Sequence, residues 1–479
     1  MKFIGKKFNT QYFLSLLIAC ALFLSSGVQA KDPKNNQSEH PQNIIIMFAD
    51  GAALTQWDFG QYSSERVRKT KFSVTQEVIH TGTFGLMTTS SNNAYITDSA
   101  AAASAMSTGH KVNNGSISMS PDGKPLPTLL TRAKQAGKQI GLITTATVYD
   151  ASPAAFSVNV KSRRDYEEIV NQYFSLKPDV LMGGGSDYFL PNTLPSGMRK
   201  DGRNMLNEFG AAGYGVAQKL SDLEQIKSKR LLGLFALEDM DFEIDRDRNI
   251  QPSLVQMTKA ALEVLDPKRG FVLFVENENI DTAGHRNDVA ALMRDLWAFD
   301  DAVKLAIEYQ KKNPKTLLIV TGDHETGGFS PTYAKKTLSA TTNQLYVDDQ
   351  QLNRIAGFKI SLQELSDRLN QKIKDGASPE LLRAYLSAQL EENFPGIRVE
   401  PDLEKAILDR QPLQLNQSYI PANILGQMIA RQTGFYWGTS GHTPEPTVVA
   451  AIGPGASQFK GYLDNTDFAK IIIKLLKLQ

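Results

Sequence analysis

The sequence has almost no cysteine, no excess of charge of either sign and no apolar run long enough for a comfortable membrane span. Its one cysteine, Cys20, lies in an N-terminal segment that we expect to be removed, so no disulfide would stabilise the mature chain. A formal net charge of +1 gives no support for a nucleic-acid-binding protein or a polybasic membrane surface. Tandem repeats and low-complexity tracts are also absent. The 35 glycines and a hydrophobic content of 41% suit a soluble α/β enzyme.

The first residues have the pattern of a secretory signal peptide. Three lysines precede the apolar run of residues 12–24, and small residues lead to a cleavage site after Ala30. We therefore expect residues 1–30 to be removed, residues 31–42 to form a polar, flexible segment, and the protein to be periplasmic or secreted. The alternative is a lipoprotein anchored at Cys20, which the apolar residues directly after that cysteine disfavour.

Apolar runs alternate with helical patterns along the rest of the chain. The runs are nearly continuous in Val, Ile, Leu and Phe, as in strands buried on both faces, and they comprise residues 43–51, 139–152, 178–189, 270–281, 316–325 and 446–455. Apolar residues recur with helical spacing in residues 253–265 and 288–309. The pattern predicts an α/β fold with a large, mainly parallel central sheet and helices on both faces, in a catalytic domain over residues 43–479. Such a sheet binds its ligands at the carboxyl ends of its strands.

Between about residues 343 and 435 the buried-strand pattern stops and amphipathic helices replace it. Ser361 and Glu364 have the spacing of a capping box, and Ser378 followed by Pro379 is a typical helix start. We interpret this stretch as a helical insertion in the sheet domain rather than an independent domain.

The stretch AYITDSAAAASAMSTG, residues 94–109, combines the pair Asp98–Ser99 with a run of very small side chains. One interpretation is a tight contact between helices. The other is that Ser99 begins a helix whose backbone N–H groups face an anion. The stretch alone favours the first interpretation, because helices of small residues are common.

Acidic and imidazole side chains gather at the predicted strand ends. They are Asp50, Asp150, Glu276, Asp281, His285, Asp323, His324 and His442. Any one of them alone is more often a capping or hydrogen-bonding residue than a ligand, but a parallel sheet brings its strand ends to one edge. So many carboxylates would repel one another unless divalent cations lay between them. Imidazole with carboxylate suits zinc, and carboxylate with hydroxyl suits magnesium.

More than one metal ion fits these ligands better than a single ion. Glu276, Asp281 and His285 could share one ion only if the chain turned sharply, which Gly284 would permit. Two ions roughly 3.5–4 Å apart clamp the attacking and leaving oxygens of a phosphoryl transfer. A guanidinium would suit the free phosphate oxygens, and on chemistry alone either arginine of the pair at residues 163–164 could supply it.

Together, these motifs resemble the alkaline phosphatase family. The motifs are TDSAAAASAMSTG, DASPAAF followed by SR, VENENID followed by GH, TGDHETGG and SGHT, and they appear in the family's order from about residue 43 to near the C-terminus. The region between His324 and His442 is covered poorly. The resemblance implies hydrolysis of small-molecule phosphate monoesters through a phosphorylated serine, with two zinc ions and one magnesium ion, in a homodimer.

The resemblance also implies a role for each matching residue. Ser99 would be the nucleophile, and Arg163, oriented by Asp98, would grip the phosphoryl oxygens, which selects Arg163 over Arg164. The implied metal ligands are Asp281, His285 and His442 for the first zinc, Asp50, Asp323 and His324 for the second zinc, and Asp50, Ser152 and Glu276 for magnesium, with Asp150 in its outer shell.

The sequence departs from the family pattern at three positions. Thr282 stands where relatives often carry Lys or His, and Ala49 and Ala52 stand where glycine is frequent. The helical insertion resembles a region that covers the active-site mouth in relatives, so it either sets substrate access or dimer contacts, or packs peripherally without a role. The alternative functions are a phosphodiesterase or sulfatase of the same superfamily, and a catalytically silent metal- or phosphate-binding protein. A serine esterase has no support, because Ser99 is not in a G-x-S-x-G motif.

Overall fold

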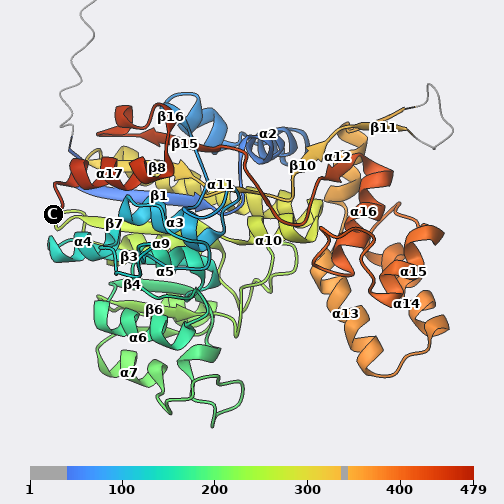
Figure 1. Cartoon of the computed structure of the whole chain (residues 1–479), viewed down its shortest axis with the longest axis horizontal. Helices are drawn as coiled ribbons and strands as arrows, with labels where there is room; N and C mark the ends of the chain where they lie inside the picture. Colours follow the sequence, from blue (N-terminus) through green and yellow to red (C-terminus); the bar gives the residue numbers. More distant parts are fainter. Residues whose placement is uncertain (1–39, 336–343) are drawn as a thin grey trace, which may run out of the picture. The chain divides into compact units, whose positions relative to one another are not determined.

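The computed structural model describes residues 40–335 and 344–479 of the chain (Figure 1). The expected signal peptide with Cys20, residues 31–39 of the expected flexible segment and residue 343 lie outside these ranges. Within the described residues, the fold is built on a 10-stranded sheet. In spatial order its strands are β16 (Gly461–Leu463), β2 (Thr83–Met87), β15 (Thr447–Ile452), β8 (Thr316–Thr321), β1 (Asn43–Ala49), β7 (Phe271–Asn277), β3 (Gln139–Thr147), β4 (Val180–Gly184), β6 (Leu231–Leu234) and β5 (Gly215–Ala217).

The sheet is mainly parallel, as predicted. The strands from β8 to β5 pair in parallel, and among the described strands of this sheet only β15 runs the opposite way, between β8 and β2. Each of the six predicted apolar runs contains one strand. The sequence missed β2, β5, β6 and β16, which are short, and the burial of β2 and β16 is incomplete. Strands of three to five residues place only one to three side chains on each face, which is too little apolar pattern to detect.

Helices cover both faces of the sheet. In β1, Ile45 and Met47 pack into one hydrophobic core, whereas Ile44 and Ile46 pack into the other. The first core is shared with α2 (Leu54–Ser63), α9 (Leu254–Val264), α10 (Asn279–Arg286) and α11 (Val289–Lys312). The second is shared with α3 (Ser99–Thr108), α4 (Leu129–Gln135), α5 (Ala151–Ala155), α6 (Tyr166–Leu176), α7 (Met205–Ala211) and α17 (Asn465–Leu476). None of the helices in the described ranges is long and apolar enough to cross a bilayer.

The stretch expected to be helical contains five helices and little else. They are α12 (Asp349–Ala356), α13 (Leu362–Lys374), α14 (Pro379–Asn393), α15 (Pro401–Asp409) and α16 (Ala422–Thr433), grouped in Figure 1. Ser378 caps α14 as predicted, with its Oγ 3.3 Å from the N–H of Leu381. The capping box at Ser361 is only half right: its Oγ accepts from the N–H of Glu364, but the Glu364 carboxylate accepts from Arg368 instead of returning to Ser361.

Helix α3 resolves the two interpretations of the small-residue stretch. Its ten residues are all buried, and it packs against α5 and α17, so the small side chains do serve close helix packing. Its N-terminus nevertheless lies at the carboxyl edge of the sheet, beside residues that follow β1 and β8. The close helix packing is therefore confirmed, and an anion facing the N–H groups of the first turn stays a prediction.

A buried carboxyl between α11 and the segment before β2 makes the stability of the fold depend on pH. Asp300 is 2% exposed, and its Oδ1 accepts from the N–H of Val74 at 2.8 Å. Burial raises the pKa of Asp300 to about 7. Because the folded-state pKa lies above the unfolded value, the stabilisation is complete at low pH and is lost as the pH rises through about 7.

We therefore expect Asp300→Asn to become more stable relative to the parent as the pH rises. The difference in the free energy of unfolding should grow by about 1–2 kcal/mol between about pH 6 and about pH 8.5, measured by urea unfolding. Asp301→Asn is the matched control, because Asp301 is half exposed and pairs with Arg68. If the free energy of unfolding had the same pH dependence in Asp300→Asn and in the parent, the raised pKa of Asp300 would be contradicted.

Candidate active site

The N-terminus of α3 presents a serine at the carboxyl edge of the sheet. Asp98 caps the helix: its Oδ1 accepts from the N–H of Ala101 at 2.9 Å and its Oδ2 accepts from the N–H of Gly115 at 2.8 Å. This cap fixes Ser99 in the first turn, where the helix dipole is positive. The Ser99 Oγ lies 3.2 Å from Nε2 of His324.

Asp50, Asp323 and His324 form a cluster that we call the second cluster. Asp50 follows β1 and the other two follow β8, which is the parallel neighbour of β1, so the sheet itself brings them together. The Nε2 of His324 lies 3.5 Å from Oδ1 of Asp50 and 3.2 Å from Oδ2 of Asp323. Both carboxylate oxygens are buried and accept no hydrogen bond from a described residue. Such unpaired buried oxygens are costly unless a cation lies between them.

Asp281, His285 and His442 form what we call the first cluster. Asp281 and His285 are one turn apart on α10, with Oδ2 and Nε2 3.1 Å from each other, and His442 comes from β14 (His442–Thr443). The Nδ1 atoms of His285 and His442 donate to the carbonyls of Ser440 and Thr97 at 2.7 and 2.8 Å. If both imidazoles are neutral, their single N–H is the one on Nδ1, so each Nε2 carries an unprotonated lone pair. The two Nε2 atoms face each other at 3.2 Å. A bound cation resolves that repulsion.

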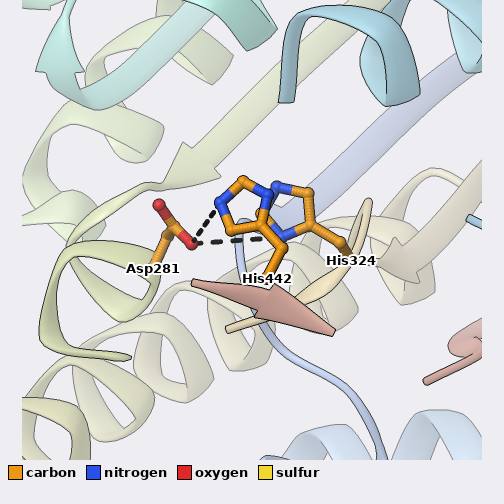
Figure 2. A group of neighbouring side chains, drawn as sticks. All are labelled: Asp281, His324 and His442. Carbon is orange, nitrogen blue, oxygen red and sulfur yellow. Dashed lines mark ion pairs between the residues drawn. The ribbon is translucent and has the colours of Figure 1, made fainter. Parts of the chain in front are cut away.

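His324, a residue of the second cluster, also contacts the first cluster. Its ring stacks on that of His442, with the ring centroids 3.6 Å apart. Figure 2 shows the two rings and the Asp281 carboxylate directed at both. Asp281, His324 and His442 offer three ligand atoms within 4.8 Å of one another, and so do the three residues of the second cluster. The two clusters are therefore contiguous.

A third group of oxygen donors adjoins the second cluster at Asp50 and consists of Asp50, Ser152 and Glu276. The Ser152 hydroxyl donates to Oδ2 of Asp50 at 3.2 Å, and the Thr144 hydroxyl donates to Oε2 of Glu276 at 2.5 Å. Oε1 of Glu276 is buried and accepts no hydrogen bond from a described residue. The donors here are carboxylates and hydroxyls without imidazole, which is the set that magnesium prefers.

Arg163 extends into the cavity between two carboxylates. Its Nη1 lies 3.4 Å from Oδ2 of Asp98, and its Nη2 lies 3.2 Å from Oδ1 of Asp150. Burial would lower the pKa of Arg163, but Asp150 and Asp98 outweigh burial and hold it above its usual range. Arg164 lines the same cavity but pairs with neither carboxylate. Asp150, expected in the outer shell of magnesium, is thus placed as the partner of the arginine.

Charge is concentrated in this site. Burial and repulsion from Asp323 raise the pKa of Asp50 well above its usual range. Burial alone would also raise the pKa of Asp281, but its three histidine neighbours outweigh burial and hold it well below its usual range. Burial lowers the pKa of His324 well below 6.5 and also lowers that of His442. Pairing with Asp281 outweighs burial and raises the pKa of His285, so this imidazole must lose a proton to bind a metal ion, whereas His324 and His442 favour the neutral form that binds one.

The sharp turn that Gly284 would permit is not formed. Gly284 lies inside α10, so no sharp turn separates Asp281 from His285; the helical spacing itself places both on one face. A Cβ at position 284 would lie 2.8 Å from the carbonyl oxygen of Thr326, so the glycine allows α10 to approach β9 (Glu325–Thr326) closely. Glu276 does not join Asp281 and His285 in the first cluster; its carboxylate belongs to the third group of oxygen donors, where it accepts from Thr144.

The sequence missed several residues of the site. Thr326 donates to Asp281 and lies 3.2 Å from Nδ1 of His324, so it holds both clusters together. Buried Glu325 accepts from Gln56 and from Thr443, which fixes the strand that carries His442. Both residues belong to the motif TGDHETGG and directly follow its predicted ligands Asp323 and His324.

The clusters open into a cavity of about 740 Å³ with further residues that the sequence did not single out. Glu278 accepts from the Thr282 hydroxyl at 2.6 Å, and burial together with Asp239 raises the pKa of Glu278 well above its usual range. Tyr166 and Tyr419 also line the cavity, although no pattern in the sequence distinguishes them from other tyrosines.

This arrangement is that of a candidate metal centre with a serine and an arginine beside it, as in a metal-dependent hydrolase. The alkaline phosphatase family profile matches residues 41–478. The chain is 32% identical to alkaline phosphatase 3 of Bacillus subtilis, with 98% of each chain covered. The structure superposes on the alkaline phosphatase of Thermus thermophilus with a TM-score of 0.83 at 28% identity, covering 95% of each chain. For the cold-active alkaline phosphatase of a psychrophilic Shewanella sp., the TM-score is 0.72 at 29% identity, covering 91% of this chain and 99% of the other.

The chain therefore belongs to the alkaline phosphatase family, and it is a phosphomonoesterase. The resemblance inferred from five motifs is confirmed over nearly the whole chain, including the helical stretch that those motifs did not cover.

Proposed function

We propose that the protein hydrolyses phosphate monoesters in two steps through a phosphorylated Ser99, with two zinc ions and one magnesium ion. The observation that carries this proposal is the position of the Ser99 Oγ, 3.2 Å from a histidine of a cluster with unpaired carboxylate oxygens. The first cluster would hold one zinc ion and the second cluster the other. Ser152, Glu276 and Asp50 would hold magnesium.

The residues of the chain have separate tasks in this reaction. Ser99 Oγ attacks phosphorus and the alcohol leaves with the bridging oxygen; water then attacks the phosphoserine and releases inorganic phosphate. Arg163, held by Asp98 and Asp150, binds two phosphoryl oxygens, and the N–H groups of α3 add positive potential. The zinc ions would lower the pKa of the serine hydroxyl and of water and would stabilise the leaving oxygen.

We further propose that the protein is exported through a signal peptide over residues 1–30 and acts as a homodimer in the periplasm or outside the cell. The lysine-rich start and the small residues before position 30 support export. The family resemblance supports the dimer. Size-exclusion chromatography with light scattering tests the dimer, and N-terminal sequencing of the exported protein tests cleavage after Ala30.

Three substrates with one reporter group distinguish the candidate functions. We expect p-nitrophenyl phosphate to be hydrolysed with a kcat/KM at least about a hundredfold above that for bis-p-nitrophenyl phosphate or p-nitrophenyl sulfate. The reason is that the Arg163 guanidinium suits a phosphate with two free oxygens, and a cation held by the third group would add positive charge that favours a dianion. Preference for the diester or the sulfate would identify the superfamily alternatives, and no hydrolysis of any ester by metal-loaded protein would identify a silent binding protein.

A further inference from the structure

The helical insertion contributes one aromatic side chain to the catalytic cavity. Tyr419, in the segment between α15 and α16, lines the cavity and is 36% exposed. Its ring lies 5.1 Å from the His285 ring, and the Arg286 guanidinium lies 5.1 Å from the centroid of the tyrosine ring.

Backbone and amide contacts fix the place of this tyrosine. The N–H of Tyr419 donates to Oδ1 of Asn423 at 2.8 Å, and Nδ2 of Asn423 donates to the carbonyl of His285 at 2.8 Å. The segment is therefore tied directly to the helix that carries two residues of the first cluster. Because the ring is preorganised, a contact with substrate costs little ordering entropy.

The position of Tyr419 relative to Ser99 follows a chain of contacts across the site. Ser99 contacts His324, and the ring of His324 stacks on that of His442. The Nε2 of His442 faces the Nε2 of His285. The ring of Tyr419 in turn lies beside the His285 ring. In phosphoryl transfer the attacking and leaving oxygens are roughly in line. Ser99, the first cluster and Tyr419 line one cavity, so a leaving group directed away from Ser99 shares that space with the first cluster and Tyr419.

We propose that Tyr419, supported by Arg286, forms a leaving-group subsite that selects phosphate monoesters of aromatic alcohols; this inference rests on the proposed function. The cavity of about 740 Å³ has room beyond the phosphoryl group for such a ring. The insertion thus acts on substrate choice rather than packing peripherally.

The test compares phenyl phosphate with glycerol phosphate, and the readout is the ratio of their kcat/KM values. An aromatic contact contributes about 0.5–1.5 kcal/mol beyond its area, so Tyr419→Leu should lower this ratio roughly three- to tenfold, mainly through KM for phenyl phosphate. Tyr419→Phe keeps the ring and should keep the ratio within about twofold. Tyr462→Leu is the matched control, because Tyr462 is 66% exposed on the edge strand β16.

An unchanged ratio in Tyr419→Leu overturns the inference, even if both rates fall, because a structural role would reduce both alike. A second measurement needs no variant: phenylphosphonate should inhibit the parent enzyme roughly three- to tenfold more strongly than methylphosphonate, and equal inhibition overturns the inference. Failure of the parent enzyme to hydrolyse either ester would instead contradict the proposed function.

Discussion

Replacing Ser99 with alanine should reduce kcat for phosphate monoesters by about 10³-fold or more, with nearly unchanged stability. The variant lacks the only group that the proposed route phosphorylates, whereas Arg163 and the metal ligands remain. The side chain makes one hydrogen-bond contact, with His324, so the free energy of unfolding should change by about 1 kcal/mol or less. Steady-state kinetics and urea unfolding on the same preparation measure both quantities.

Trapping the intermediate separates loss of the nucleophile from a general loss of activity. Parent enzyme quenched with acid during turnover should yield a peptide phosphorylated at Ser99, and the alanine variant should yield none. Ser104→Ala is the matched control on the same helix: its buried Oγ accepts from the N–H of Ser118 at 2.7 Å, so the variant should lose stability and still be phosphorylated. Turnover by Ser99→Ala near the parent rate would exclude the covalent route.

The fold was predictable from sequence wherever a segment is buried on both sides. β1 and β7 are continuous in large apolar residues because helices cover both faces, and this composition distinguishes them without an alignment. β5 has three residues, two of them only half buried, so no periodicity exists to detect. The direction of β15 depends on the connection from β14, which local composition does not encode.

For the site, the sequence indicates which residues can bind a metal ion but not how they are positioned. Asp281 and His285 have the spacing of one helical turn, but the sequence alone did not show that they lie on one helix, or that Gly284 between them allows a close contact with Thr326. Tyr419 reaches the cavity through tertiary contacts with α10, and residues so far apart in the chain share no local pattern. Short motifs therefore identify the candidate ligands, whereas the residues that shape the cavity come from distant segments and are not predictable from local patterns.

Removing bound metal ions should have an effect as large as removing the nucleophile, and it should also lower stability. Chelation leaves Asp50, Asp323 and Glu276 with buried, unpaired oxygens and leaves two imidazole lone pairs facing each other. Activity should fall at least about a hundredfold after exhaustive chelation and dialysis, and zinc with magnesium should restore it. An ion that binds only the folded state, at about a thousand times its Kd, stabilises it by about 4 kcal/mol, so the free energy of unfolding should fall by a similar amount.

The Ser99→Ala variant makes this prediction independent of catalysis. It retains every proposed metal ligand, so chelation should lower its free energy of unfolding as much as that of the parent enzyme, although it has almost no activity to lose. Mass spectrometry of the intact, undenatured protein would count the ions, and Asp323→Asn, which weakens the second cluster alone, should remove fewer of them than chelation does. If the unfolding curves of both proteins were the same with and without chelator, the two clusters would not be metal sites, because these buried carboxylates and imidazoles would then have to be stable together without a cation.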